Sequence, residues 1–435
     1  ALAGLTVAGS DTVFGNTVEV AGGGLTVNGF GGTTTINSDV TSGGAIDIND
    51  AVVIAGGGSV TVSTAAADAA ISILGTVNAE TANTESLVLA SGAGTITLSS
   101  DVGETAALAN LTITADGEVE LNESITAGTD IDLGAATDVQ LGSDVTLTAG
   151  GTVTLDAVDG RFGLTVDAST IDFEAAVGQN DAPTAVTLVS VNDLVLDQAI
   201  TSTGLVSATT TTGLINQSST VTADAVTVNS ASGITGTGTI RADSDVSLEA
   251  AEGISWTAGS ITGGSTVSVI SRGEDTEDIA LVALSGGDVV IDAGALGDVT
   301  LNGAVSGGTG VSADGFDLTI AATGSVDSNG DVTFDALQDL AIDGAVTAAG
   351  TARMTSADAA ITATADVSGT DVVFDAGTGT VAFNTSQQDN LLGRTTINAG
   401  GGITATVNIL ADGDLVVNDV LTVDGGGVRT LTSQT

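Results

Sequence analysis

Residues 299–342 read VTLNGAVSGG TGVSADGFDL TIAATGSVDS NGDVTFDALQ DLAI. Apolar side chains in this stretch stand two residues apart, as Val299 and Leu301 do. A spacing of two is the period of a β-strand that buries one of its faces. Such groups return after about 20 residues, and short strands that recur at a fixed interval of this size are typical of a coiled β-solenoid.

Three apolar registers recur in this way between residues 299 and 423. The first consists of Val299/Leu301, Leu318/Ile320, Leu340/Ile342, Ile361/Ala363, Val381/Phe383, Ile403/Ala405 and Leu421/Val423. The second consists of Val311/Ala313, Val332/Phe334, Ala352/Met354, Val372/Phe374, Thr395/Ile397 and Leu415/Val417. The third holds single residues, namely Val305, Val326, Val346, Val367, Leu391 or Leu392, and Ile409. We expect all of these side chains, including Phe334, Phe374 and Phe383, to point into the core.

The pattern predicts an all-β fold, namely a single-stranded right-handed parallel β-helix (β-solenoid) of roughly 20 coils of about 21 residues each. The right-handed sense follows from the strong preference of strand-to-parallel-strand crossovers. We expect one continuous solenoid over residues 1–435, with looser or looped regions near 78–86, 179–184, 200–245 and 272–278. Because the chain begins at Ala1 without methionine, we expect it to be a processed chain or a segment of a longer one.

The composition is strongly acidic. There are 54 Asp and Glu residues against 6 basic residues, all of them arginine, and the formal net charge is −48. Such a surface repels nucleic acid and anionic lipid, so neither is an expected partner. Cysteine is absent, which excludes disulfides and thiolate metal sites. No run of about 18 apolar residues occurs, so we expect no direct membrane insertion.

Two stretches, 297–307 (GDVTLNGAVSG) and 339–348 (DLAIDGAVTA), resemble the coils of large bacterial exoproteins. These are the filamentous-haemagglutinin-like and autotransporter-like β-helical adhesins. The likeness lies in glycine corners, Thr, Ser and Asn on the outer face, and the lack of lysine, and it covers nearly the whole chain. The resemblance implies a secreted, extracellular or cell-surface bacterial protein, structural or adhesive, that forms a stalk, a fibre or a surface layer.

An enzyme is the alternative, because many β-helices bind or cleave polysaccharides. Histidine and lysine are absent and the arginines are scattered singly, which disfavours lyase chemistry. A glycosidase needs only a pair of carboxylates, and the acids supply many pairs, such as Asp130/Asp132 and Asp412/Asp414. Such pairs are more simply explained as outward residues of strands and turns. We therefore predict a protein without catalytic residues, and a carbohydrate-active β-helix remains the second reading.

Two segments are weak candidates for calcium, which prefers carboxylate and amide oxygens. The candidate ligands are Asp327, Asn329 and Asp331 around a glycine turn, and Glu274, Asp275, Glu277 and Asp278 in the most charged segment of the chain. Asp and Asn are also ordinary turn residues, so diffuse binding of divalent cations by the acidic surface is the broader expectation. No cofactor is required by this reading. The other expected partners are further copies of the chain, end to end or side by side, and a surface polysaccharide or host surface.

Overall fold

The computed structural model describes residues 4–273, 278–384, 393–411, 413–423 and 431–433. The chain is an all-β parallel β-solenoid of about 19 turns, with roughly 21 residues in each turn, which confirms the predicted fold class. Within the described residues the only helical element is η1, a short 3-10 helix at Ala65–Ala67. Short strands and glycine corners leave no segment long enough for an α-helix.

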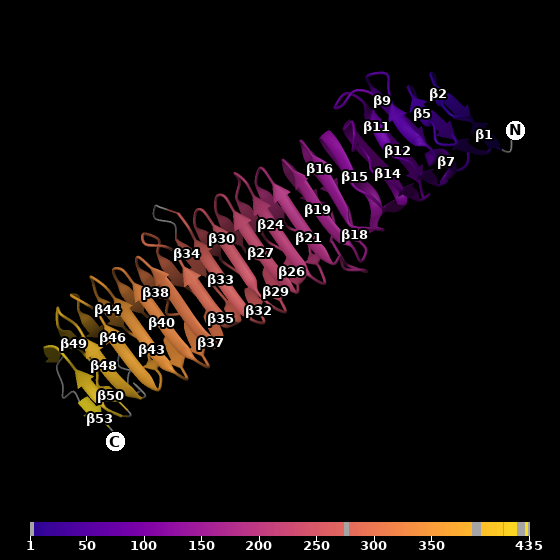
Figure 1. The fold of residues 1–435 in the computed structure, drawn as a ribbon. Coiled ribbons are helices and arrows are strands. Elements are labelled where there is room, and N and C mark those ends of the chain that lie inside the picture. The colour runs from indigo at the N-terminus through magenta and orange to yellow at the C-terminus, as the bar shows by residue number, and fades with distance from the viewer. Residues whose placement is uncertain (1–3, 274–277, 385–392, 412, 424–430, 434–435) are drawn as a thin grey trace. The chain divides into compact units, whose positions relative to one another are not determined.

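The contacts between residues divide the chain into two compact units. The first comprises Ala1–Gly213 and Ser219–Ala223, and the second comprises Leu214–Ser218 and Asp224–Thr435. Each unit is built in the same way, from parallel strands that pair with the equivalent strand one turn later (Figure 1). One continuous solenoid over residues 1–435 remains a prediction.

The first apolar register of the second unit forms one ladder of parallel strands. Its strands are β36 (Val299–Leu301), β38 (Leu318–Ile320), β41 (Leu340–Ile342), β44 (Ile361–Ala363), β47 (Val381–Phe383), β49 (Ile403–Ala405) and β52 (Leu421–Val423). The backbone pairs the predicted residues in register, Val299 with Leu318 and Leu318 with Leu340, and continues in this way to Leu421. The predicted pairing is therefore confirmed, and the side chains are buried from Val299 to Ala405, whereas Leu421 is half-buried and Val423 is exposed.

The second register is also confirmed, and the third is confirmed from Val305 to Val367, while its predicted member Ile409 is buried in β50 (Ile409–Ala411), which pairs with β53 (Leu431–Ser433). The second runs through β37 (Ala304–Gly315), β40 (Asp331–Ala336), β43 (Thr351–Ser356), β46 (Asp371–Asp375), β48 (Arg394–Asn398) and β51 (Leu415–Val417). The third pairs Val305, Val326, Val346 and Val367 through β37, β39 (Ser325–Ser328), β42 (Ala345–Ala348) and β45 (Val367–Ser368). Its predicted member at Leu391 or Leu392 lies outside the described residues.

Strand β37 differs from the expectation of separate short strands, because it passes through the third register and the second without interruption. Glycines make this possible. A Cβ on Gly307 would lie 2.2 Å from the carbonyl oxygen of Gly310, so only glycine lets the strand bend this sharply at the corner. β37 therefore pairs with β39 (Ser325–Ser328) before the bend and with β40 after it.

In the first unit, one ladder joins β1 (Gly4–Ala8), β4 (Gly24–Asn28), β7 (Ile46–Ile48), β10 (Ile71–Ile73) and β13 (Ile96–Leu98). A second joins β2 (Thr12–Phe14), β5 (Thr33–Ile36), β8 (Ala51–Ile54) and β11 (Val77–Ala79). Inward and outward residues alternate, as in β4 and β7. Burial of one face on each strand is what gives the unit a continuous core.

The regions expected to be looser contain both turns and strands. Residues 200–245 carry seven strands, from β23 (Ile200–Thr201) to β29 (Thr239–Ala242), with the same alternation of burial. Near 179–184, the buried carboxylate of Asp159 accepts the backbone N–H groups of Asn180 and Asp181 at 2.8 and 3.2 Å. Near 78–86, the side-chain oxygen of Asn78 accepts the N–H groups of Thr105 and Ala106. Side-chain oxygens thus satisfy backbone donors at these two interruptions of the ladder.

Large side chains in the core are accommodated by small residues on the adjacent turn. Trp256 is fully buried in β31 (Ile254–Trp256), and its indole N–H donates to the carbonyl of Gly238 at 3.2 Å. Its ladder partner is Gly236, where a Cβ would lie 2.1 Å from the indole ring. Phe374 and Phe383 meet edge to face with ring centroids 5.2 Å apart. The predicted inward position of these phenylalanines is confirmed.

The register assignment can be tested on one strand. Leu340 is buried, whereas Ala341 faces outward and is partly exposed. We expect Leu340→Asn to lower the free energy of unfolding by about 3 kcal/mol, because it leaves a buried amide among apolar side chains. Ala341→Asn is the matched control and should change it by less than about 0.5 kcal/mol. Urea unfolding of both variants measures the difference, and equal losses would contradict the register.

Candidate functional site

Every outward residue of a solenoid becomes a member of a column, because in-register pairing places it above its equivalent in the preceding turn. One column on the second-register sheet holds three aspartates. Asp292 ends β35 (Leu284–Asp292), and Asp314 and Asp335 are the second-last residues of β37 and β40. We call these three residues the aspartate column. The next two positions of the same column are Thr355 and Asp375. Three carboxylates therefore follow one another at the spacing of neighbouring strands, about 4.8 Å.

The aspartate column lines a cavity of about 530 Å³, whose opposite side is formed by small and apolar residues that include Ala295 and Leu337. Desolvation by burial raises the pKa of Asp314 above its ordinary value, and the charges of Asp335 and Asp292 raise it further. A carboxyl with a raised pKa beside ionised carboxylates is the arrangement that general acid catalysis requires, and it also attracts cations. This cavity is the strongest candidate for chemistry in the described residues.

A second group of stacked acids has a structural role. Asp278, Asp298, Asp317 and Asp339 each stand directly before a strand of the first register, and three successive carboxylates accept the N–H of the next aspartate at 3.1, 3.1 and 2.8 Å. Burial raises the pKa of Asp298, while the hydrogen bond from Asp317 acts in the opposite direction. Backbone donors thus hold these acids at the corner of each turn.

The predicted calcium ligands are dispersed. Asp327 lies in β39 and Asp331 begins β40, so they belong to different columns, and the Asp331 carboxylate accepts the N–H of Thr351 at 2.6 Å. Asn329 lies in the exposed turn between these strands. Asp278 is exposed and accepts the N–H of Asp298, while Glu274, Asp275 and Glu277 lie outside the described residues. Among described residues, no three acidic side chains are grouped as a metal site would need. Calcium binding by these residues remains a prediction.

In the first acid pair considered for a glycosidase, both carboxylates accept backbone N–H groups. Asp130 and Asp132 lie in β15 (Ile125–Leu141), and the Asp130 carboxylate accepts the N–H of Thr152 at 2.8 Å. Asp132 accepts the N–H of Gly134 at 3.1 Å. Of the second pair, Asp412 lies outside the described residues.

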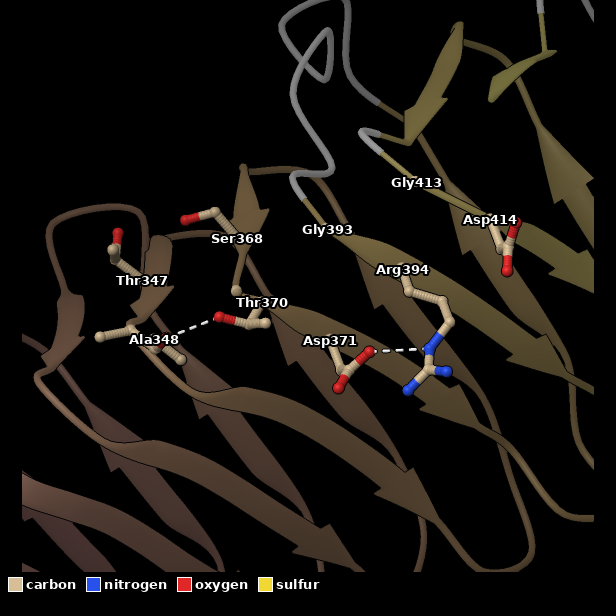
Figure 2. A pocket seen from close by; sticks show the side chains of 11 residues that line it. Thr347, Ala348, Ser368, Thr370, Asp371, Gly393, Arg394, Gly413 and Asp414 are labelled. Atoms are coloured by element: carbon tan, nitrogen blue, oxygen red, sulfur yellow. Dashed lines mark hydrogen bonds and ion pairs between the residues drawn. The ribbon is translucent and has the colours of Figure 1, made fainter. Parts of the chain in front are cut away.

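A larger groove surrounds Arg394 (Figure 2). It has a volume of about 880 Å³, and its polar lining residues are Thr347, Ser368, Thr370, Asp371, Arg394 and Asp414. We call it the arginine groove. Arg394 donates from Nε to Asp371 Oδ1 at 2.9 Å, and this bond together with the charge of Asp371 raises the pKa of Arg394. The guanidinium stays largely in solvent, since 62% of the Arg394 side chain is exposed.

Sequence reasoning missed both the aspartate column and the arginine groove. The signal for the column was present, because each of its acids directly follows the second inward residue of a second-register strand, as Asp314 follows Ala313 and Asp335 follows Phe334. Aligning the outward residues by the register of the inward ones would have placed the three aspartates in one column. The groove has no such signal, because its residues come from two registers and from the corner between them.

Comparison of the chain with protein-family models, with curated proteins and with solved structures finds no match. In the part of the chain that the structure describes, no helix is long and apolar enough to cross a membrane. Architecture and surface chemistry are therefore what bear on function.

The raised pKa of Asp314 gives a pH-dependent prediction. The folded protein holds the Asp314 proton more tightly than the unfolded chain does. This contribution to stability is full below the ordinary carboxyl pKa of about 3.9 and is lost as the pH rises through the raised value. We expect Asp314→Asn to be more stable than the wild type at pH 7, by about 0.5 kcal/mol for solvent-screened neighbours, and to lose this advantage towards pH 3.

Urea unfolding over a pH series measures the effect. Asp375→Asn is the matched control, because Asp375 occupies the same column between Thr355 and Asn398, without an acid on either side. It should show no gain at pH 7. An Asp314→Asn variant that is no more stable than the wild type at pH 7 would contradict the assignment.

Proposed function

We propose that this chain is a non-catalytic structural or adhesive protein of the bacterial cell surface, part of a stalk, a fibre or a surface layer. The observation that carries the proposal is the repeated parallel pairing of each turn with the next within each unit. Such repetition provides length and a long lateral surface from little sequence information. Extended presentation of a surface is the task that this architecture suits best.

The outer face fits a protein that works in contact with solvent and other surfaces. The outward column of the first-register sheet consists of Thr300, Thr319, Ala341, Thr362, Ala382, Thr404 and Thr422. These side chains are small, polar or β-branched, and they leave an even face. The net charge of −48 favours solubility and disfavours binding to nucleic acid and anionic lipid.

The rival function, a carbohydrate-active β-helix, is favoured by one specific observation. The aspartate column sets three carboxylates in a cavity and raises the pKa of the middle one, Asp314. A retaining glycosidase needs an acid and a carboxylate about 5 Å apart, which stacked strands can provide. The two proposals therefore differ in whether this cavity turns over a glycan.

Three measurements decide between them. In the source organism, antibodies should label intact cells as strongly as permeabilised cells, and deletion of the gene should reduce attachment to a surface. The purified protein, incubated with neutral and acidic polysaccharides from pH 4 to 8, should release no new reducing ends. Labelling confined to permeabilised cells would remove the surface role, and release that is abolished by Asp314→Asn would establish the rival.

We further propose that divalent cations and other copies of the chain are its partners. Acids on neighbouring turns lie about 4.8 Å apart, closer than the screening length of about 8 Å at physiological ionic strength, so they repel one another. A divalent cation between two carboxylates relieves that repulsion, within one molecule or between the sides of two molecules.

Calcium should therefore raise the thermal unfolding midpoint and promote association of copies. The midpoint and the light scattering would be compared in chelator, in calcium and in sodium chloride of matched ionic strength. A response to calcium alone indicates bridging, and an equal response to sodium indicates screening. A midpoint that is the same under all three conditions would contradict the proposed role of cations.

A further inference from the structure

The arginine groove has the construction of a binding site. Thr347 of β42 and Ser368 of β45 stack on successive turns and form one side. Asp371, at the start of β46, and Arg394, at the start of β48, stack on successive turns and form the other side, which Asp414 continues before β51. Figure 2 shows the Arg394 side chain reaching towards Asp371, with Asp414 on the following turn.

Glycines line part of the groove and allow neighbouring turns to approach closely. Gly393 has a φ of 90°, and a Cβ there would lie 2.1 Å from the carbonyl oxygen of Thr370. The other small residues that line the groove are Ala348, Ala349, Gly369 and Gly413. The described lining contains no aromatic and no large aliphatic side chain.

Hydrogen-bonding capacity remains free in the groove. Arg394 uses Nε for Asp371, and among the described residues its two terminal nitrogens donate to no protein atom. The Thr370 hydroxyl donates to the carbonyl of Ala349 at 2.8 Å and keeps its lone pairs for a further donor. Guanidinium donors, carboxylate acceptors and hydroxyl groups therefore line the same groove.

The charges restrict what can bind there. Asp371, Arg394 and Asp414 sum to a charge of −1, and the molecule as a whole carries −48. The negative charge of the molecule repels an anionic ligand. The guanidinium, which lies between the two carboxylates in the column, repels a cationic ligand. A neutral molecule with many hydroxyl groups can donate to the carboxylates and accept from the guanidinium at the same time.

We propose that the arginine groove binds a neutral polysaccharide. Its polar groups repeat on neighbouring turns at about 4.8 Å, a distance comparable with the length of one sugar ring, so a chain of sugars laid along the turns meets them in succession. This inference deepens the proposed function, on which it rests, because it supplies the chemistry by which a surface protein would adhere.

Affinity electrophoresis tests the proposal with gels that contain dextran, mannan or xyloglucan, and with polygalacturonate as the anionic comparison. The wild type should be retarded by at least one neutral polymer and not by polygalacturonate. Arg394→Gln and Asp414→Asn should each weaken the apparent affinity about tenfold, the loss expected for hydrogen bonds to charged groups. Mobility in polymer-free gels corrects for the altered charge, and thermal unfolding verifies that each variant is folded.

Arg161→Gln is the matched control. Arg161 pairs with Asp181 at 3.0 Å in an exposed ion pair of the same chemistry, in the first unit and outside the groove, so its loss should leave retardation unchanged. Lack of retardation by all three neutral polymers would overturn the proposal, as would equal retardation of the wild type and folded Arg394→Gln. This assay uses purified protein and does not depend on where the protein lies in the cell. Failure of polysaccharide binding can therefore be distinguished from failure of the cell-surface labelling.

Discussion

In-register parallel pairing between turns is the constraint on which the rest of this structure depends. Each residue lies about 4.8 Å from its equivalents in the turns before and after it, so the chemistry of a position is repeated along a column. An inward column is therefore mostly apolar, and its members must also match in volume. The pairing of Trp256 with Gly236 illustrates this, because the indole occupies the space that a side chain on the partner would need.

The same constraint makes charge a problem on the outer face, since equal charges stacked in a column repel one another. One column that begins the second-register strands avoids this by alternation: Asp245, Thr266, Asp288, Gly310, Asp331, Thr351, Asp371, Arg394 and Asp414. No two acids are adjacent in it. The column through Asp278 and Asp298 compensates differently, with backbone N–H groups donated to each carboxylate. In the aspartate column no neutral residue separates the three acids, and the pKa of the middle one, Asp314, is raised.

How much the sequence could predict follows from the same geometry. The inward registers were predictable residue by residue, because hydrophobic burial acts on every turn alike and leaves a period that a single sequence reveals. Thr395 was also assigned inward by register, and it is fully buried although its hydroxyl has no hydrogen-bond partner. The grouping of outward residues was not predicted. The number of residues between equivalent strands varies from turn to turn. The backbone at corners such as Gly307–Gly310 decides which outward columns lie next to each other.

Departures from the rule of each column therefore indicate function better than any motif in this chain. A position that merely maintains the solenoid needs only a small polar residue outside and an apolar residue inside. Arg394 replaces the neutral spacer of its column by a cation, at a corner where hydroxyl groups of another register lie opposite. The aspartate column omits the spacer altogether. Neither departure is needed to stabilise the strands around it, since neighbouring turns form the same ladders without it. Both departures lie in hollows. In the aspartate column a cation or a hydrogen-bond donor would offset the repulsion among the carboxylates, and in the arginine groove the guanidinium keeps terminal donors in solvent for a ligand.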